Sequence, residues 1–389
     1  LGDVVRGRDL GELILGAVSR ICFSSQGDVL YTSDMDGPNI LAWPLSIDEA
    51  GLVRIGPPAS MASPGGLSAG QSRVWLDRST QQPVFSYDQG DPQRQYLFSL
   101  ESAGSDLRPI PCPDRYVVDS CLSRGWIAHT VVNGGDWSIA LYDINRSERF
   151  AVFPGRGAQF SPDGRLVAVA NFQGAAVYAV PSQRELYRID GVRMGTNVFA
   201  DDGTLALFAM KAPPGVLIIE STTGRRLAFF PASASAMRPR NFSGAFVGKS
   251  NHLLVFGERN QLLGWNLDLV RGQLRSYGLD WDPPGASQTP PVNSLIQPLK
   301  LHIDWGGRRR EFLRKATEGQ IRRRSPGRVL TALNDRLEMT PDDVDLLAER
   351  GRLYLHTLGE PEKAAQDLHR ASGLAPNDRE IQALLTELD

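Results

Sequence analysis

Short apolar runs alternate with compact polar corners from the N-terminus to about residue 266. The stretch QFSPDGRLVAVA at 159–170 shows the pattern most clearly, and CFSSQGDVLYTS at 22–33 and VFADDGTLALFA at 198–209 repeat it. Residues 161–164, Ser-Pro-Asp-Gly, fit a type I turn. The apolar run over 166–170 is typical of a strand buried on both faces. The alternation therefore predicts antiparallel strands joined at tight corners.

This unit recurs along the chain. Each corner carries an aromatic residue or an apolar substitute, and successive corners are 39 to 52 residues apart: Phe23, Trp75, Cys121, Phe160, Phe199 and Phe246. A third predicted strand follows and carries one large residue: Trp43, Phe98, Tyr142, Tyr178, Ile219 and Trp265. A period of about 40 to 45 residues made only of strands is typical of four-stranded β-propeller blades. We therefore predict an all-β propeller with six visible blades, whose aromatic residues fill the seams between neighbouring blades.

The ring has two ways to close. The segment GRDLGELIL at 7–15 predicts an outermost strand, whereas the last copy is followed after Leu269 by VRGQLRSYGLDWDPPG instead of a fourth strand. The N-terminal segment would then complete the last blade. The alternative is a seventh blade upstream, and we expect an upstream part because the chain begins at Leu1 and not at Met.

The order of these pieces resembles a known family. FSPDGRLVAVA followed by AAVYAV is similar to WD40 repeats, and 265–285 followed by a helical repeat resembles the C-terminal part of large bacterial WD40-repeat proteins. Many of those proteins carry a Ser/Thr protein kinase domain at the N-terminus. The chain departs from the WD40 pattern because no His follows a Gly, and the closing Trp-Asp pair appears only in altered forms such as Trp265-Asn266. The resemblance implies a degenerate WD40-like propeller without the internal His/Asp hydrogen-bonded tetrad.

The pattern becomes helical after the proline-rich stretch PPGASQTPP at 283–291. LLAERGRLYLHTLGEPEKAAQDLHRASGLAPND resembles one tetratricopeptide repeat (TPR), which needs small, packing or turn residues at fixed places: Gly351, Tyr354, Gly359, Ala364, Leu368, Ala371 and Pro376. We predict a propeller over 1–282, a Pro-rich linker and connecting segment over 283–307, and an α-helical TPR-like domain over 308–389. Because so few repeats rarely stand alone, we expect this domain to dock on a neighbouring surface.

The composition of the chain argues against several classes of protein. The net charge is −2 and the sequence pI is near 6.3, so no overall field indicates a nucleic-acid or membrane-surface protein. No run of 18 apolar residues predicts a membrane span, and no signal peptide is visible. Cys22, Cys112 and Cys121 fit neither a disulfide framework nor a zinc template. We expect a cytoplasmic protein, with extracytoplasmic tethering through an upstream span as the alternative.

The motifs that resemble catalytic or metal sites lack the context they need. GLSAG at 66–70 matches the nucleophile elbow around Ser68, but no helical pattern follows it. DMDGPN at 34–39 and DINRSE at 143–148 resemble calcium loops without the required Gly and Glu, so we interpret them as turns. The protein-kinase motif set is absent as well. We predict no enzymatic activity, cofactor or metal; a propeller-based hydrolase or lyase is the alternative.

The segment RRREFLRKATEGQIRRRSPGR at 308–328 holds nine basic residues against two acidic ones. Its arginines are candidate contacts to an anion or a partner: Arg308, Arg309, Arg310, Arg314, Arg322, Arg323 and Arg324. We favour pairing with the acidic residues of 335–349, because only Phe312 supplies an aromatic among the arginines. Nucleic-acid binding through 308–328 stays the alternative.

These patterns together predict a non-catalytic platform. Its blades would hold loops rigidly for a protein or peptide partner, because binding residues commonly lie on loops fixed by a rigid scaffold. The resemblance implies the sensory or partner-binding tail of a bacterial signalling protein such as a Ser/Thr kinase.

Overall fold

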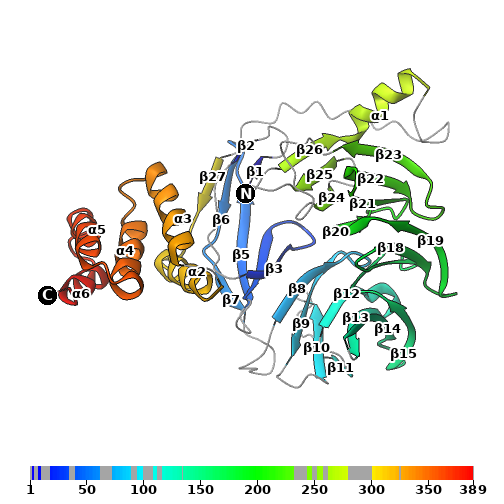
Figure 1. Cartoon of the computed structure of the whole chain (residues 1–389), viewed down its shortest axis with the longest axis horizontal. Coiled ribbons are helices and arrows are strands. Elements are labelled where there is room, and N and C mark those ends of the chain that lie inside the picture. Colours follow the sequence, from blue (N-terminus) through cyan, green and yellow to red (C-terminus); the bar gives the residue numbers. More distant parts are fainter. Residues whose placement is uncertain are drawn as a thin grey trace.

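The structure is a computed structural model of the whole chain. It describes residues 2–3, 8–9, 18–34, 40–61, 72–88, 94–99, 108–111, 116–133, 135–231, 243–247, 252–256, 262–278, 300–323 and 326–388. The sheets lie around a common centre with their first strands innermost, and the C-terminal helices lie beside the sheet formed by the first strands (Figure 1). The chain is therefore a β-propeller followed by a small α-helical domain, as predicted.

Within the described residues the strands form six blades of antiparallel strands paired in chain order, except that the last strand of the first blade, Ala59–Met61, pairs with Ile40–Ile47. The first blade consists of β3 (Val18–Phe23), β4 (Val29–Asp34), β5 (Ile40–Ile47), β6 (Leu52–Ile55) and β7 (Ala59–Met61), and the second of β8 (Ser72–Asp77), β9 (Gln82–Asp88), β10 (Arg94–Ser99) and β11 (Arg108–Pro111). The third consists of β12 (Tyr116–Cys121), β13 (Trp126–Asn133), β14 (Asp136–Asp143) and β15 (Glu148–Pro154), and the fourth of β16 (Gly157–Phe160), β17 (Leu166–Ala170), β18 (Gly174–Ala179) and β19 (Arg184–Asp190). The fifth consists of β20 (Val192–Phe199), β21 (Leu205–Lys211), β22 (Pro214–Glu220) and β23 (Arg226–Pro231), and the sixth of β24 (Ser243–Val247), β25 (His252–Phe256) and β26 (Leu262–Asn266).

The two ends of the ring are only partly described. A separate pair, β1 (Gly2–Asp3) and β2 (Arg8–Asp9), precedes the first blade, and most of the predicted closing strand at 7–15 lies outside the described residues. After the three described strands of the sixth blade the chain forms α1 (Leu267–Ser276), at the place where the sequence lacks a fourth strand. The route of ring closure and a seventh blade therefore stay predictions.

The corner turns form as the sequence predicts. The Ser161 hydroxyl donates to Asp163 at 2.6 Å, and the Gly164 N–H donates to the Ser161 carbonyl at 2.9 Å. Gly164 has a φ of +71°, and a Cβ atom there would lie 2.7 Å from the Cys121 sulfur of the preceding blade. The equivalent corner glycines also have positive φ: Gly27, Gly125 and Gly203. Glycine is needed because this backbone conformation and this close approach both exclude a side chain.

Apolar side chains fill the seams between blades. Phe160 is 2% exposed and packs between the third and fourth blades, while Phe199 and Phe246 occupy the next two seams in the same way. These corner predictions are confirmed. The prediction for Phe23 is wrong, because Phe23 is 47% exposed and its neighbour Cys22 faces the second blade instead. Successive strand residues point to opposite faces, and Cys22 occupies the face that packs on the second blade.

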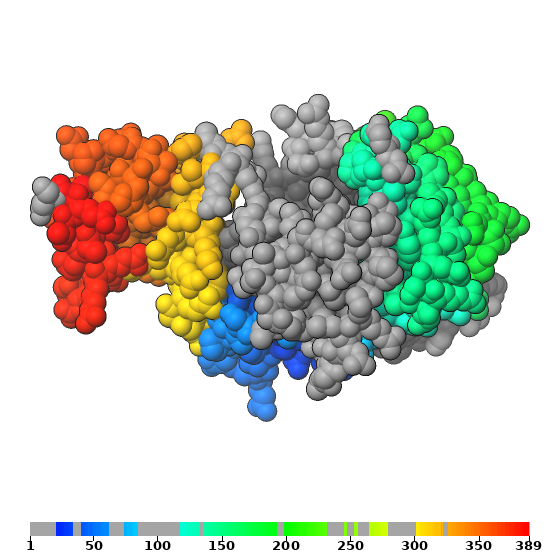
Figure 2. Space-filling model, turned by 90° about the horizontal axis from the view of Figure 1, so that it is seen from below, coloured from blue at the N-terminus to red at the C-terminus, as the bar shows by residue number. Residues whose placement is uncertain are grey.

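The first blade also carries the helical domain. β27 (Lys300–Ile303) pairs in parallel with β6, so this part of the predicted connecting segment belongs to the first sheet. Trp43 is fully buried, yet it does not fill a seam between blades: its ring lies 5.7 Å from Trp305 and 5.3 Å from Phe312. Figure 2 shows the yellow atoms of α2 against the blue atoms of this blade. The expected docking of the helical domain is thus confirmed.

The helical domain consists of short helices, each packed against the next along the chain. They are α2 (Arg309–Arg323), α3 (Pro326–Met339), α4 (Val344–Leu353) with a π-helical turn at Tyr354–Leu358, α5 (Pro361–Leu374) and α6 (Arg379–Thr386). A Cβ atom at Gly351 would lie 2.8 Å from Leu368 Cγ, so the glycine permits the close approach of α4 and α5. Among the described helices, each is too short or too polar to span a lipid bilayer.

Polar side chains join the innermost strands around the ring. Three of them each accept a backbone N–H from the next blade: Asp77 from Leu122, Asp119 from Phe160, and Gln159 from Val198. Arg78 of the second blade donates to the Phe199 carbonyl and, at 2.6 Å, to the Asp201 carboxylate of the fifth blade. These bonds tie non-adjacent parts of the sequence together at the centre of the propeller.

Candidate functional site

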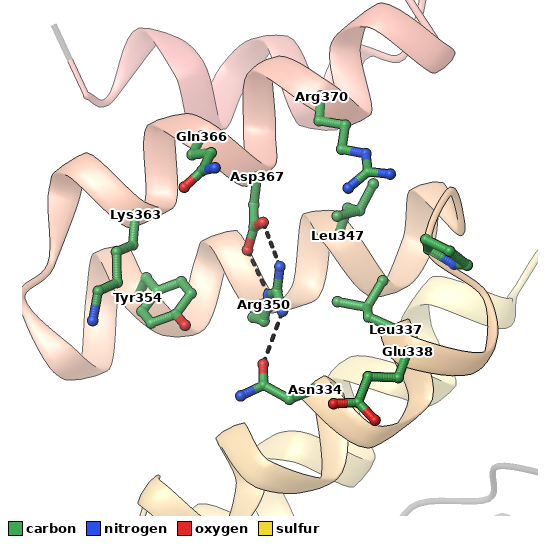
Figure 3. Close-up of a pocket in the computed structure, with 11 residues that line it drawn as sticks. Asn334, Leu337, Glu338, Leu347, Arg350, Tyr354, Lys363, Gln366, Asp367 and Arg370 are labelled. Carbon is green, nitrogen blue, oxygen red and sulfur yellow. Dashed lines mark hydrogen bonds and ion pairs between the residues drawn. The ribbon is translucent and has the colours of Figure 1, made fainter.

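A groove with a volume of about 490 Å³ lies between α3, α4 and α5 (Figure 3). It is lined by Asn334, Leu337, Glu338, Pro341, Leu347, Arg350, Tyr354, Lys363, Gln366, Asp367 and Arg370. Figure 3 shows Arg350 at the centre, with the Tyr354 and Lys363 side chains at one end and Leu337, Leu347 and Arg370 at the other. We call this set of residues the groove.

Arg350 is held at the centre of the groove by two neighbours. Its Nε and Nη2 atoms each donate to the Asp367 carboxylate at 2.7 Å, and Nη1 donates to Asn334 at 2.8 Å. The hydrogen bond with Asp367 raises the pKa of Arg350, so the guanidinium stays charged. A guanidinium has five N–H donors. Within the described part of the chain, two of the five have no protein acceptor, so they are available to a ligand.

The rim of the groove carries two exposed cations. Lys363 pairs with Glu360 at 2.7 Å and Arg370 pairs with Asp342 at 2.8 Å, and all four side chains are exposed. The Lys363 ammonium also lies 5.5 Å from the centre of the Tyr354 ring. Exposed pairs of this kind are weak and exchange partners readily. The groove therefore offers two exposed cations on either side of the fixed Arg350 guanidinium.

The sequence contains a local signal for the groove, which the sequence analysis missed. Several lining residues directly precede predicted packing residues of α4 and α5: Arg350 before Gly351, Lys363 before Ala364, Asp367 before Leu368, and Arg370 before Ala371. Adjacent helix residues are about 100° apart around the axis. Once one residue of each pair packs between helices, its neighbour lies at the edge of that contact. Only the angle between the helices decides that these edges face one another.

The predicted basic contacts lie elsewhere, on α2. Arg309 pairs with Asp343 at 2.5 Å and with Asp345 at 3.0 Å. Arg310 pairs with Asp345 at 2.8 Å and with Asp378 at 2.9 Å. Both side chains therefore join α2 to the start of α4, and Arg310 also joins it to the start of α6. The contacts with Asp343 and Asp345 are the predicted intramolecular pairing with residues 335–349.

The other candidate arginines are more exposed or less fully described. Arg308 pairs with Glu311 at 2.9 Å and Arg314 with Glu380 at 3.4 Å. Only the helical backbone of Arg322 and Arg323 is described, and Arg324 lies outside the described residues. A contact between these arginines and a partner stays a prediction.

The ion pairs of α2 keep their charges because each group stabilises the other. Burial acts to lower the pKa of Arg310, but hydrogen bonds to Asp378 and Asp345 outweigh it and raise the pKa above its usual value. The hydrogen bond from Arg310 in turn lowers the pKa of Asp378, and hydrogen bonds from Arg308 and Lys315 lower that of Glu311 to about 2. These groups therefore stay ionised at neutral pH.

In the described residues, the remaining motifs do not bring together side chains that could form a catalytic or metal site. Ser68 lies outside them, as does nearly all of 34–39. The 143–148 segment is a turn between β14 and β15, in which Asp143 accepts from the N–H groups of Asn145 and Arg146. In the part of the chain that is described, no three His, Cys, Asp or Glu side chains come together as metal ligands would.

Comparisons with known proteins give weak similarities. No family model matches the chain. The dihydro-heme d1 dehydrogenase of Pseudomonas aeruginosa is 25% identical over 217 residues, which span 51% of this chain and 42% of that protein. Among solved structures, the Dos1 propeller has a TM-score of 0.44 at 15% identity, covering 64% of this chain and 68% of its own. Hsv2 of Kluyveromyces lactis has a TM-score of 0.43 at 11% identity, with coverages of 64% and 73%.

Proposed function

We propose that this chain is a non-catalytic binding platform whose groove holds a segment of a partner protein. The observation that carries the proposal is the Arg350 guanidinium, fixed by Asp367 and Asn334 with two N–H donors left for a ligand. A donor held in this way loses little conformational entropy when a ligand binds.

The chemistry of the groove favours an acidic segment. Arg350, Lys363 and Arg370 offer positive charge, whereas the buried Leu337 and Leu347 expose only small parts of their side chains to the groove. Glu338 at the edge of the groove would repel an acidic group placed beside it. The segment would therefore set its carboxylates over the cations and away from Glu338.

The propeller would act as a rigid support for this groove. The packing of Trp43 against Trp305 and Phe312 supports a fixed position of the helical domain on the first blade. The resemblance to bacterial WD40-repeat proteins and to a TPR supports a place in signalling, as a partner-binding tail associated with a Ser/Thr kinase. The match to the Pseudomonas aeruginosa dehydrogenase covers 42% of that protein, so the support for a binding role comes from the groove.

The test compares charge reversals on the same helical domain. The full chain is titrated with fluorescein-labelled peptides that combine Glu with Leu, Gln with Leu, or Lys with Leu, and anisotropy reports binding. Reversing Lys363→Glu and Arg370→Glu together is expected to weaken binding of the acidic peptide about tenfold or more. Arg328→Glu, an exposed change on α3 outside the groove lining, is the matched control and should leave binding within about twofold.

Two results would contradict the proposal. One is equal binding of the acidic peptide by the groove variant and the Arg328→Glu control. The other is a preference for the Gln or Lys peptide. Single-stranded DNA serves as a further ligand, and tight salt-dependent DNA binding that only α2 variants remove would favour the nucleic-acid alternative instead.

A further inference from the structure

A second feature lies on the propeller, far along the chain from the groove. The Arg156 guanidinium, between β15 and β16, lies between two aromatic rings. Its carbon is 4.0 Å from the centre of the Trp137 ring and 4.2 Å from the centre of the Phe172 ring. We call Trp137, Arg156 and Phe172 the arginine stack. Trp137 belongs to the third blade and Phe172 to the fourth, so the stack bridges two blades.

The backbone holds the arginine stack in place. The Arg156 N–H donates to the Ala170 carbonyl at 2.7 Å, which joins its loop to β17. The Asn171 side chain closes the turn after β17 through two backbone N–H groups, at 2.8 and 2.9 Å. Lys211 of the fifth blade donates to the Phe172 carbonyl at 2.7 Å. Phe172 is nevertheless 71% exposed, so an aromatic ring is fixed at the surface by its neighbours.

The stack leaves one part of the guanidinium open. Its central carbon lies over both aromatic rings, and its five N–H donors lie in the plane of the group. Within the described residues, no side-chain hydrogen bond or ion pair of Arg156 occupies those donors. A planar donor fork with fixed orientation suits a carboxylate, which accepts two parallel N–H···O bonds. The Lys211 ammonium adds positive charge on the same turn.

We propose that the arginine stack is a docking site for an acidic side chain of a partner protein, with an apolar neighbour of that side chain resting on Phe172. Exposed aromatic and arginine residues held rigidly are typical of residues that dominate binding energy at interfaces. Asp136, next to Trp137, and Asp190, which pairs with Gly174 across the sheet, are exposed nearby. Their charges favour a single carboxylate over a polyanion such as nucleic acid.

This proposal is independent of the groove, and its test separates the two. The full chain carrying Lys363→Glu and Arg370→Glu, which weaken the groove, is titrated with the fluorescein-labelled Glu/Leu peptide. Arg156→Lys keeps the charge but removes the planar fork, and is expected to weaken the remaining binding about tenfold. Phe172→Ala removes one ring of the stack and should weaken it about threefold to tenfold. Arg165→Lys, an exposed arginine at the opposite end of the same blade, is the matched control.

Comparison of Arg156→Lys with Arg165→Lys decides between the possible outcomes. Loss of binding with Arg156→Lys but not with Arg165→Lys supports the proposal. No binding in the groove-disabled background, or equal binding by the two lysine variants, overturns it while leaving the groove proposal intact. Tighter binding of a phosphoserine version of the peptide, or of single-stranded DNA, overturns the assignment to a carboxylate.

Discussion

The propeller and the helical domain of this chain are held together by different forces. In the propeller, neighbouring blades bury large apolar residues such as Phe160 and Phe199 against each other. In the helical domain, Asp343 and Asp378 each cap a helix N-terminus and also bind an arginine of α2. A carboxylate at this position is stabilised twice, by the helix N–H groups and by the guanidinium.

The difference follows from the amount of surface that each region can bury. Blades repeat around a centre, so almost every sheet has a neighbour on both faces. The helical domain is small, and small units bury a lower fraction of their surface. Its helices therefore rely more on specific charged contacts to fix their orientation.

The largest effect is expected from Phe160→Ala, which should lower the free energy of unfolding of the propeller by about 3–5 kcal/mol. The reason is the cavity left in a seam where the ring is nearly fully buried. Phe23→Ala is the matched control, because that corner residue is exposed, and it should cost less than about 0.5 kcal/mol. Urea unfolding followed by tryptophan fluorescence checks both. Equal costs at the two corners would show that the seams do not dominate propeller stability.

Arg310→Ala should destabilise the helical domain by about 3 kcal/mol, because it leaves Asp378 without its cation and Asp345 with Arg309 alone. The Arg310 side chain is 16% exposed, so solvent compensates only partly. Far-UV circular dichroism during thermal unfolding measures the change, with the exposed Arg328→Ala as control.

The effect of Arg310→Ala should depend on pH. Arg310 lowers the pKa of Asp378 in the folded state, so this pairing contributes fully above the unfolded pKa of about 4 and is lost as the pH falls below it. The stabilities of the wild type and of Arg310→Ala should therefore become equal in acid. A constant difference down to the lowest pH would exclude the ion pairs as the cause.

The propeller should respond to pH in the opposite direction through Asp119. Burial raises the pKa of Asp119 from 3.8 to about 7. Between these values the unfolded chain loses the proton and the folded one keeps it, so stability falls as the pH rises from 4 to 7. Asp119→Asn cannot ionise and keeps an oxygen for the Phe160 N–H. It should stabilise the propeller by about 2 kcal/mol at pH 8 and have little effect at pH 4. Fluorescence-monitored urea unfolding at both pH values checks this.

The smallest effects are expected from one substitution at two helix glycines. Gly351→Ala places a methyl group against Leu368 and should cost about 1.5 kcal/mol. Gly373→Ala, in α5, meets open space and should raise stability by about 0.5–1 kcal/mol through better helix propensity. Thermal unfolding by circular dichroism compares them. Stabilisation by both substitutions would contradict the close approach of α4 and α5.

Local sequence signals predicted most of the fold but little of the candidate sites. The corner turn at 161–164 could be predicted because proline, aspartate and glycine each favour one local geometry. The exposure of Phe23 could not be predicted, since a shift of one residue along a strand exchanges the buried and exposed faces. The arginine stack was missed for a related reason. Trp137, Arg156 and Phe172 are separated in sequence and meet only when two blades stand side by side.

The repeated blade, its corners and the change to helices near the C-terminus can be predicted from the sequence, because each depends on contacts between residues close in the chain. Tertiary structure alone decided that Trp43 meets Trp305 and Phe312, that Arg350 stands at the centre of a groove, and that Arg156 lies between two rings. These contacts depend on the angles at which whole blades and helices pack. Such angles arise from many weak interactions summed over the fold, and no short stretch of sequence encodes them.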